Sequence, residues 1–437
     1  MPNGPTYDAV AAGGIGPPIV RSAIRTGALC VPKIRKEKKL RGSGNDLDAG
    51  AAELMNQAAG LREELWKRAA DSDRDRRLPD EVMARVTGAG LTRLLVPESN
   101  GGHETSVRTL LEVCTELGRG CVSTAWVTGV LNVGNFVVSL FPERTRAEVW
   151  DDDPDARTAL ILGAPVRTVE PADGGVRVSG EWPYASGSLH AEWIGGLLLA
   201  DTGTGLQPHF ALMPAADITV RDTWHFVGMR GTGSNTVVAE KVFVPAHRLL
   251  PYKPLIDGET DGLVPDGRRY RNSLTGVFMV GLIGSLLGGA DTALRHALEH
   301  AGTRRVAGTT FASQAESPTA RLALAAAATR LDTARLHARR LADSVDEHAR
   351  AGENPDLLTR ARARMDATHV VQQCRQAVDD IVTLYGSSAL DESNPLQRLW
   401  RDVHTGSRHA GFGMGVPEQV YGSALVGQDP RTVSMLV

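Results

Sequence analysis

The chain has 437 residues, more than one hydrophobic core usually organises, so we expect two or three domains. Its composition, 42% hydrophobic and 5% aromatic, is that of a globular protein and excludes a disordered or fibrous chain. The net charge of −3 gives little attraction to nucleic acid or to an anionic membrane, and we expect neither as a partner.

Residues 1–45 differ from the rest, because scattered Gly and Pro surround a short apolar run and the basic cluster "KIRKEKKLR" at 33–41. The positive charges follow the apolar run, whereas a signal peptide has them first. No stretch approaches the roughly 20 apolar residues that span a bilayer. We expect a solvated, poorly ordered leader, with the folded part beginning near Asp46. A binding patch is the alternative, which the lack of interleaved aromatic residues disfavours.

The cysteines are widely spaced and form no CxxC pair: they are Cys30, Cys114, Cys121 and Cys374. This usage is typical of small buried side chains in a reducing compartment rather than of a disulfide framework. We therefore expect a cytoplasmic protein.

Residues 46–155 are predicted to form an N-terminal helical domain. In "DLDAGAAELMNQAAGLREELWKRAA", Leu54, Leu61 and Leu65 recur on one helical face. Helical patterns with start and stop signals follow in "LPDEVMARVTGAG" and over residues 106–141.

Residues 156–255 are predicted to form a β domain, because "GGVRVSGEW" and "NTVVAEKVFVP" are short β-branched runs near turn signals. Residues 256–437 predict a C-terminal helix bundle. Its first long helix, "SLTGVFMVGLIGSLLGGADTALRHALEHAG", is apolar nearly all round and is expected to be buried. Helices, then strands, then a bundle favour an α+β fold with segregated layers over a doubly wound sheet.

Two kinds of motif do not occur in the sequence. No GxGxxG fingerprint follows a predicted strand, and no HExxH motif or Cys/His cluster with metal-ligand spacing is present. We expect no metal site, and we expect the chain not to bind NADH itself.

Four sequence motifs resemble motifs of the acyl-CoA dehydrogenase superfamily and follow one another along the chain as they do in that superfamily, over about residues 48–425. "LLVPESNGG" (94–102) is similar to the turn after its second helical segment, and "MRGTGSNTVVAEKVFVPAHR" (229–248) to the end of its β domain. "WPYASGSLHAEW" (182–193) and "LWRDVHTGSRHAGF" (399–412) resemble the flavin-dependent monooxygenase branch. That branch includes the oxygenase components of 4-hydroxyphenylacetate and steroid-phenol hydroxylases. The resemblance implies an N-terminal helical domain, a central β domain and a C-terminal helix bundle.

The motif at 399–412 separates the two branches. When Arg401-Asp402 is placed on the Arg-Asp pair of the dehydrogenases, Ala410 falls where many of them carry their catalytic Glu. His409 falls where the monooxygenases carry a His, so the resemblance implies a catalytic His409. An imidazole that titrates near neutrality can take a phenolic proton and return it. The alternative is a histidine hydrogen-bonded in a helix interface, which is also the expectation for His404.

The resemblance implies that Ser186 is catalytic and binds the cofactor, donating a hydrogen bond toward flavin N5 and protecting a C4a-hydroperoxide. A hydroxyl can both donate and accept, which suits this role. The alternative is a turn serine before Gly187. Trp182 is a candidate for covering the flavin ring, or is only a strand residue.

The resemblance implies further cofactor contacts in the C-terminal helix bundle, residues 256–437. "TRRVAG" resembles the segment that reaches the flavin of a neighbouring subunit, so Arg304 is a candidate phosphate clamp, and Arg305 could do the same. "LYGSSAL" (384–390) resembles a small-residue turn in which Gly386, Ser387 and Ser388 donate to the cofactor. Relatives pack as tetramers, and we expect a homotetramer.

The implied function is the oxygenase component of a two-component monooxygenase, hydroxylating an aromatic or other electron-rich small molecule through a C4a-hydroperoxyflavin. A separate NAD(P)H:flavin reductase would supply reduced flavin, FMNH2 rather than FADH2, and molecular oxygen would be the co-substrate. The alternatives are an N- or S-oxygenase of this branch, an acyl-CoA dehydrogenase-like flavoenzyme and a non-catalytic subunit. Gly134 stands where many phenol-hydroxylating relatives carry a His, which leaves open whether the substrate is a simple phenol.

Overall fold

The computed structural model describes residues 50–163, 168–201, 203, 205–260, 272–413 and 415–437. The chain divides into residues 1–46 and 47–437, and every described residue belongs to the second unit. The leader predicted over residues 1–45 therefore lies outside the described residues, as does Cys30.

The N-terminal part of this unit is helical. Its helices are α1 (Ala51–Asp75), α2 (Asp80–Gly88), α3 (Val107–Gly118), α4 (Val122–Ser139) and α5 (Glu143–Trp150). The α1 helix buries Leu54, Leu61 and Leu65 along one face, as the sequence predicted. In α4 every residue is buried, and the helix packs against both the first β-strand and the C-terminal bundle.

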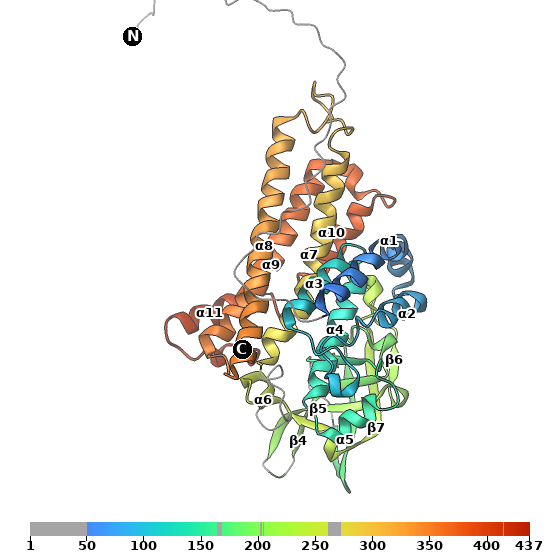
Figure 1. The fold of residues 1–437 in the computed structure, drawn as a ribbon, viewed down its shortest axis with the longest axis vertical. Coiled ribbons are helices and arrows are strands. Elements are labelled where there is room, and N and C mark those ends of the chain that lie inside the picture. Colours follow the sequence, from blue (N-terminus) through green and yellow to red (C-terminus); the bar gives the residue numbers. More distant parts are fainter. Residues whose placement is uncertain (1–49, 164–167, 202, 204, 261–271, 414) are drawn as a thin grey trace, which may run out of the picture. The chain divides into compact units, whose positions relative to one another are not determined.

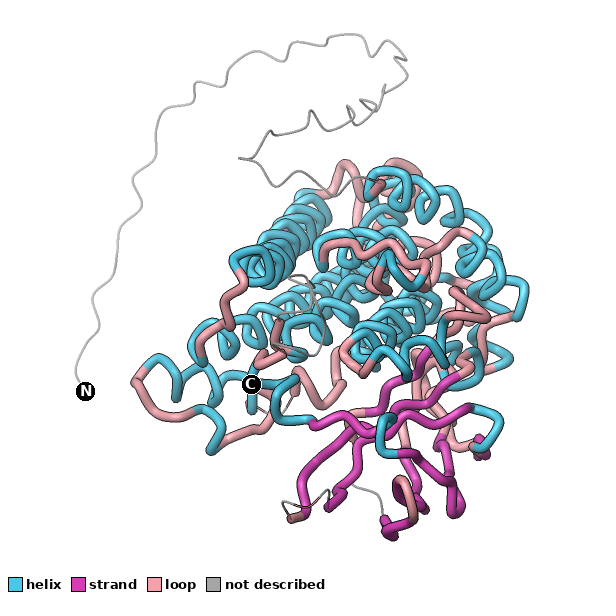
Figure 2. The backbone as a smooth tube through the Cα atoms, turned by 60° about the horizontal axis from the view of Figure 1, so that its bottom comes forward, coloured by secondary structure: helices cyan, strands magenta, loops and turns pink. Residues whose placement is uncertain are grey.

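The strands that follow form two four-stranded sheets among the described residues. One has the order β1 (Thr158–Ile161), β4 (Trp193–Asp201), β5 (Leu206–Pro214), β8 (Leu249–Pro251), with β1 parallel to β4. The other has the order β2 (Thr168–Ala172), β3 (Gly175–Trp182), β7 (Thr236–Pro245), β6 (Thr219–Arg221). Burial alternates along β3, because every second side chain of a strand faces the same side. Figure 2 shows the strands gathered on one side of the helices.

The C-terminal part is a helix bundle with long helices side by side (Figure 1). After α6 (Tyr252–Asp257), its helices are α7 (Leu274–His300), α8 (Pro318–Ala351), α9 (Leu357–Tyr385), α10 (Pro395–Gly406) and α11 (Val416–Leu425). The predicted α+β order of helices, strands and bundle is confirmed.

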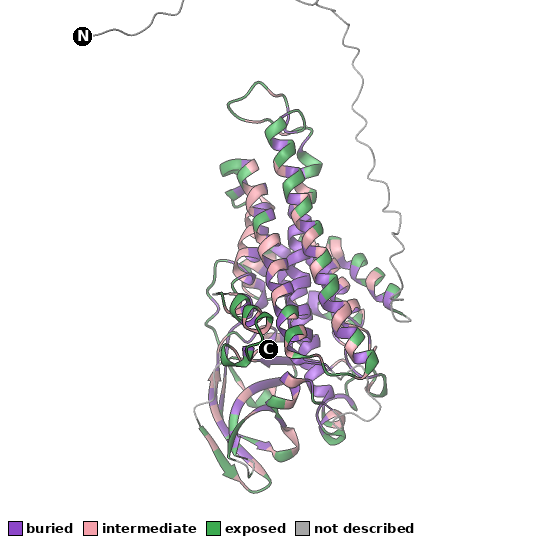
Figure 3. Cartoon of the chain, turned by 90° about the vertical axis from the view of Figure 1, so that its left-hand side faces the viewer, coloured by how far each residue is buried: buried purple, intermediate pink, exposed green. Residues whose placement is uncertain are grey.

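The α7 helix packs against α3, α4, α8, α9 and α10 and is buried continuously from Leu274 to Ala293. Figure 3 shows buried residues gathered in the middle of the helical part. Glycines allow its close packing. A Cβ atom on Gly129 of α4 would lie 1.9 Å from the carbonyl oxygen of Gly281, so only glycine permits this approach of the two helices. The burial predicted for this helix is confirmed.

Two helices correct an expectation. By length and composition, α4 and α7 are apolar enough to cross a membrane, although the sequence was expected to hold no such stretch. The qualifying windows of both are completely buried within the protein, which is the environment of a core helix. Cys114, Cys121 and Cys374 are free and buried, as predicted.

Candidate active site

Ser186 lies in the loop after β3, between two residues in the left-handed backbone region, Tyr184 with φ 64° and Gly187 with φ 79°. Its hydroxyl lies 2.6 Å from the Ser234 hydroxyl and accepts a hydrogen bond from Trp126 Nε1 at 3.3 Å. Such strained backbone at a non-glycine residue is concentrated at functional sites.

The hydroxyls beside Ser186 form a chain with a defined proton count. Thr232 donates to the carbonyl oxygen of Met229 at 2.7 Å and lies 2.7 Å from the Ser234 hydroxyl. Each hydroxyl has a single proton. Ser234 therefore donates to Thr232, and Ser186 donates to Ser234. The Ser186 proton is thus held by Ser234 and must rotate away before it can serve a cofactor.

The loop that carries Thr232 and Ser234 is tied to α10. Asp402 accepts a hydrogen bond from the Met229 backbone N–H at 2.6 Å, and burial raises the pKa of this carboxyl to about 6. Its neighbour Arg401 binds both oxygens of Asp73 on α1, at 3.0 and 2.7 Å. The Arg-Asp pair of the motif therefore fastens both α1 and the 229–235 loop to α10.

His409 follows α10, and its ring is enclosed by aromatic side chains. Ring centroids of Trp126, Phe278 and Phe412 lie 5.8, 5.6 and 5.8 Å from that of His409. The Gly411 backbone N–H donates to His409 Nδ1 at 3.1 Å. Since a backbone N–H can only donate, the proton of the neutral imidazole is on Nε2.

The charge state of His409 follows from its surroundings. Burial, together with the positive charge of Arg364, lowers the pKa of His409 to about 4. At neutral pH the ring is therefore uncharged, and in this conformation its Nε2–H is a hydrogen-bond donor.

Trp126 joins the two predicted catalytic residues. Its indole contacts the His409 ring edge-on and donates to Ser186. The structure thus brings His409 and Ser186 to one side chain of α4. Sequence reasoning missed Trp126, and the available signal was that it is the single Trp of a helix composed mostly of aliphatic and small residues.

Trp182 and Tyr184 differ in exposure. Trp182 is 0% exposed, lies in the β-domain core and donates its indole N–H to the Leu197 carbonyl oxygen at 2.9 Å. Tyr184 is 64% exposed and has edge-on contacts with Trp224 and Phe226, both at 6.2 Å. This burial counts against Trp182 as a flavin contact, and the exposed ring beside Ser186 is that of Tyr184.

His404 lies on a face of α10 that packs against α9. Its Nε2 is hydrogen-bonded to Asp379 at 2.9 Å, and the Trp400 indole donates to the same carboxylate at 2.8 Å. This is the arrangement expected for a helix-face residue.

The other predicted cofactor residues gather at the far end of the bundle. Arg304 donates to the Tyr385 carbonyl oxygen at 2.8 Å and to the Ser388 hydroxyl, and its guanidinium lies 4.1 Å over the Tyr385 ring. Gly386 (φ 67°), Ser387 and Ser388 are exposed, as is Arg305. An open pocket of about 400 Å³ is lined by His296, His300, Thr303, Arg304, Tyr385, Ser393, Asn394 and Pro395.

These two clusters belong to opposite ends of α7. Phe278, which contacts His409, and His300, which lines the Arg304 pocket, are separated by about 33 Å at a rise of about 1.5 Å per residue. The structure therefore brings Ser186 and His409 together, and Arg304 and Ser388 together, but not the two pairs within one chain.

Gly134 faces the backbone of β1. A Cβ atom at this position would lie 2.0 Å from the carbonyl oxygen of Thr158, so no side chain fits without moving the strand. The packing of α4 on β1 accounts for the lack of a histidine side chain at this position.

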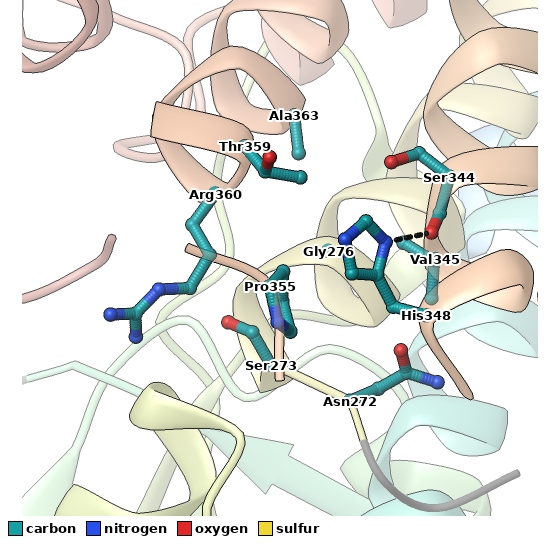
Figure 4. A pocket seen from close by; sticks show the side chains of 10 residues that line it. All are labelled: Asn272, Ser273, Gly276, Ser344, Val345, His348, Pro355, Thr359, Arg360 and Ala363. Carbon is teal, nitrogen blue, oxygen red and sulfur yellow. Dashed lines mark hydrogen bonds between the residues drawn. The ribbon is translucent and has the colours of Figure 1, made fainter. Parts of the chain in front are cut away.

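A smaller pocket lies among α7, α8 and α9 (Figure 4). It encloses about 20 Å³, room for about one water molecule. His348 Nδ1 is bonded within it to the Ser344 carbonyl oxygen at 2.7 Å, and Arg360 turns away to bind Ile256 and Asp257. Neither Ser186 nor His409 lines it. Within the part of the chain that the structure describes, no three His, Cys, Asp or Glu side chains are grouped to hold a metal.

Comparison with known proteins identifies the fold and its branch. The acyl-CoA dehydrogenase N-terminal domain matches residues 55–143, and the acyl-CoA dehydrogenase C-terminal domain matches residues 281–413. The oxygenase component of an FADH2-dependent resorcinol hydroxylase from Rhizobium sp. is 33% identical over 401 residues, covering 86% of this chain and 95% of the relative. The chain belongs to the acyl-CoA dehydrogenase family.

Further relatives place it in one branch of that family. The oxygenase subunit HsaA, a flavin-dependent monooxygenase of Mycobacterium tuberculosis, is 34% identical over 367 residues, covering 83% of this chain and 91% of that subunit. The structure of XiaF from Streptomyces sp., in complex with FADH2 and glycerol, superposes with a TM-score of 0.82 at 34% identity, covering 87% of this chain and 96% of XiaF. Within the acyl-CoA dehydrogenase family the chain groups with flavin-dependent monooxygenases, as its motifs predicted.

Proposed function

We propose that this protein is the oxygenase component of a two-component monooxygenase that uses reduced flavin and molecular oxygen to hydroxylate an aromatic substrate. The observation that carries the proposal is the position of Trp126 between Ser186 and His409. Relatives whose length the chain covers almost completely are oxygenase components of such hydroxylases.

The residues around Ser186 fit a flavin. The Ser186 hydroxyl can turn its proton from Ser234 to a ring nitrogen, and Tyr184 offers an exposed aromatic face beside it. When bound, reduced flavin supplies the activation of oxygen, which no side chain here can perform. The aromatic enclosure of His409 excludes water and strengthens each hydrogen bond made inside it.

His409 acts on the substrate as a hydrogen-bond donor in this proposal. Its Nδ1 lone pair is occupied by the Gly411 N–H, and Nε2 carries a proton that can be given to a substrate oxygen. Its predicted role as general base stays a prediction, and it requires the bond from Gly411 to break first. A neutral imidazole donor stabilises negative charge on a bound oxygen without needing a proton from solvent.

We favour FADH2 over the FMNH2 expected from the sequence. The pocket beside Arg304 is large, and its lining includes Arg304, His296 and His300, which suits the phosphate-linked nucleotide that FAD has and FMN lacks. A relative is named FADH2-dependent, and another is described in complex with FADH2. The distance along α7 supports a cofactor held by Ser186 of one subunit and Arg304 of another.

The proposed protein is a homotetramer, and the exposed face of α8 offers a surface for a contact between subunits. Leu322 and Leu336 are 73% and 69% exposed, and lie about four turns apart on the same side of this helix. Large exposed apolar side chains aligned on a surface mark protein–protein contact. A separate NAD(P)H:flavin reductase is the second proposed partner. We place this protein and the reductase in the cytoplasm, where thiols such as Cys114 and Cys374 stay reduced.

The direct test mixes the purified protein anaerobically with reduced FAD, followed by oxygen-18 gas and a panel of phenols beginning with resorcinol. One labelled oxygen in a hydroxylated product is expected. Hydrogen peroxide as the sole product with every phenol contradicts the proposal. Reduction of oxidised flavin by an acyl-CoA thioester would assign the chain to the dehydrogenases instead.

A further inference from the structure

The hydroxyl chain that ends at Ser186 has one proton for each of its contacts. Ser186 lies 2.6 Å from Ser234, and Ser234 lies 2.7 Å from Thr232. Thr232 lies 2.7 Å from the carbonyl oxygen of Met229, which can only accept. Three hydroxyl protons therefore serve three contacts. Every contact receives a proton in one arrangement only, in which each hydroxyl donates toward Met229.

Burial holds the chain in this direction. Thr232 and Ser234 are 2% and 4% exposed, so water has almost no access to them. Among the residues that the structure describes, their hydroxyl oxygens have no hydrogen-bond partner outside the chain. A buried contact that loses its proton is therefore not repaired by another group, and the lost hydrogen bond is costly. Ser186 is only partly buried, so it is the hydroxyl of the chain that a ligand can contact.

This direction makes Ser186 an acceptor toward a ligand. Its oxygen has two lone pairs, and one of them accepts from Trp126 Nε1 at 3.3 Å. The other lone pair has no donor within the described part of the chain. A ligand N–H can bond to it without disturbing the chain. A ligand lone pair, in contrast, requires the Ser186 proton to turn away from Ser234, after which two protons remain for three contacts.

The two redox states of flavin differ in this respect. The ring nitrogen N5 carries a hydrogen when flavin is reduced and has only a lone pair when flavin is oxidised. Ser186 can accept from the reduced ring at no cost to the chain. To donate to the oxidised ring, it has to give up the hydrogen bond to Ser234. A site whose buried polar groups match one ligand rejects an analogue that leaves one of them unpaired.

We propose that Thr232 and Ser234 are specificity-determining residues that select reduced over oxidised flavin, by fixing the direction of the hydrogen bond at Ser186. This inference rests on the proposed monooxygenase function. Both residues act through Ser186 and are therefore positioning residues. The same direction favours release of oxidised flavin, so that the site exchanges it for reduced flavin from a reductase.

A purely structural role for the chain is the competing explanation. Ser234 and Thr232 belong to the 229–235 loop, and their contacts fasten this loop to the loop that carries Ser186. Loss of such a tether loosens the site for either form of flavin and lowers both affinities together. The ratio of the two affinities is therefore the quantity to measure.

The experiment is an anaerobic calorimetric titration of the full chain with oxidised FAD and with FAD reduced by dithionite. The unsubstituted protein is expected to bind the reduced form more tightly, by about 5-fold or more, which is the scale of one neutral hydrogen bond. Ser234→Ala frees the Ser186 proton and leaves its lone pair available. Oxidised FAD should then bind about 5-fold more tightly, while the affinity for reduced FAD should change little.

Thr232→Val should reverse the chain. Without an acceptor at position 232, Ser234 can donate only to Ser186, so oxidised FAD should bind more tightly and reduced FAD more weakly. Thr232→Ser keeps the hydroxyl and should keep the selectivity. The matched control is Thr236→Val, which removes a buried hydroxyl that is bonded to Thr223 at 2.9 Å and not to this chain, and should leave the ratio unchanged.

Several results would overturn the inference. Equal affinity of the unsubstituted protein for both forms does so without any variant. A ratio that Ser234→Ala leaves unchanged shows that the chain is only a tether, and this variant decides alone if Thr232→Val does not fold. Because the titration measures no product, selective binding without labelled product would refute the monooxygenase function and leave the selection standing. Labelled product with an unchanged ratio in Ser234→Ala would refute the selection alone, and failure to bind either form contradicts both.

Discussion

The two ends of α7 differ in character, and in the proposed function they carry different halves of a cofactor site. At the Phe278 end, Ser186 and His409 face a buried, aromatic environment that favours hydrogen bonds to a reacting group. At the His300 end, Arg304 borders an open pocket. A reaction in which oxygen is transferred to a substrate benefits from the exclusion of water. A phosphate-bearing group instead needs accessible cations and backbone hydrogen-bond donors. Since the ends are about 33 Å apart, one chain in the proposed function holds two incomplete halves of the cofactor site.

The largest effect is expected at the buried end. His409→Ala removes the Nε2–H donor, and we expect product formation to fall by about 10² to 10⁴, the range of a catalytic proton-handling group. Oxygen consumption should continue, with hydrogen peroxide released in place of product. The matched control is His404→Ala, which should keep its coupling, the amount of product formed per oxygen consumed. Full coupling in His409→Ala would remove His409 from the mechanism.

The next effect is expected at the open end. Arg304→Ala removes a charged donor, so reduced FAD should bind about 10- to 150-fold more weakly, from about 1.5–3 kcal/mol per charged hydrogen bond. Binding of reduced FMN should hardly change if Arg304 serves the nucleotide. Titrations of both flavins check this, with Arg305→Ala as control. Equal losses for FAD and FMN would show that Arg304 does not act on the nucleotide.

A smaller effect is expected from the hydroxyl chain. Ser186→Ala should raise the fraction of oxygen lost as hydrogen peroxide several-fold, from about 1 kcal/mol for one neutral hydrogen bond. Ser234→Ala removes the competing acceptor for the Ser186 proton, so this variant should not raise the fraction of oxygen lost as hydrogen peroxide. Peroxide and product are measured together in one assay. An increase in Ser234→Ala as large as that in Ser186→Ala would show that the chain acts as a unit.

The smallest effect concerns stability at Asp402. Burial raises the pKa of Asp402 from 3.8 to about 6, so the protonated carboxyl favours the folded state. Its contribution to the free energy of unfolding is therefore full below pH 3.8 and is lost as pH rises through 6. Asp402→Asn keeps an oxygen for the Met229 N–H without this loss. The stability of Asp402→Asn relative to the unsubstituted protein should therefore rise between about pH 4 and 6. Denaturant unfolding across this range checks the sign, and the opposite trend would show that the ionised carboxylate is the favoured form.

The sequence predicted the order of the three blocks and the nature of α7, because hydrophobic periodicity reports burial within one element. Motif positions also singled out Ser186 and His409. Contacts between distant elements were not predictable in this way: Trp126 on α4 joins both residues only after the helix packs. The exposure of Trp182 and Tyr184 likewise depends on how the β-domain packs, which buries the first ring completely and leaves the second 64% exposed.

Arg364 illustrates the same limit. In "RARARM", arginines alternate with alanines. The fold buries Arg360 and Arg364, four residues apart on one face, and exposes Arg362. Nothing in a charge pattern distinguishes a buried arginine from its exposed neighbour, since the difference arises from the residues near 411 and 436 that pack over it.

The most direct test of the two incomplete halves is subunit complementation. Arg304→Ala and His409→Ala chains are each purified, then dissociated and reassembled together, and hydroxylation is measured with reduced FAD at a concentration that limits the Arg304→Ala protein. If flavin is held by Ser186 and His409 of one subunit and Arg304 of another, some mixed sites contain neither substitution and activity rises above that of both parents. If each chain completes its own site, every site keeps one defect, and mixed assemblies no more active than their parents would contradict the account.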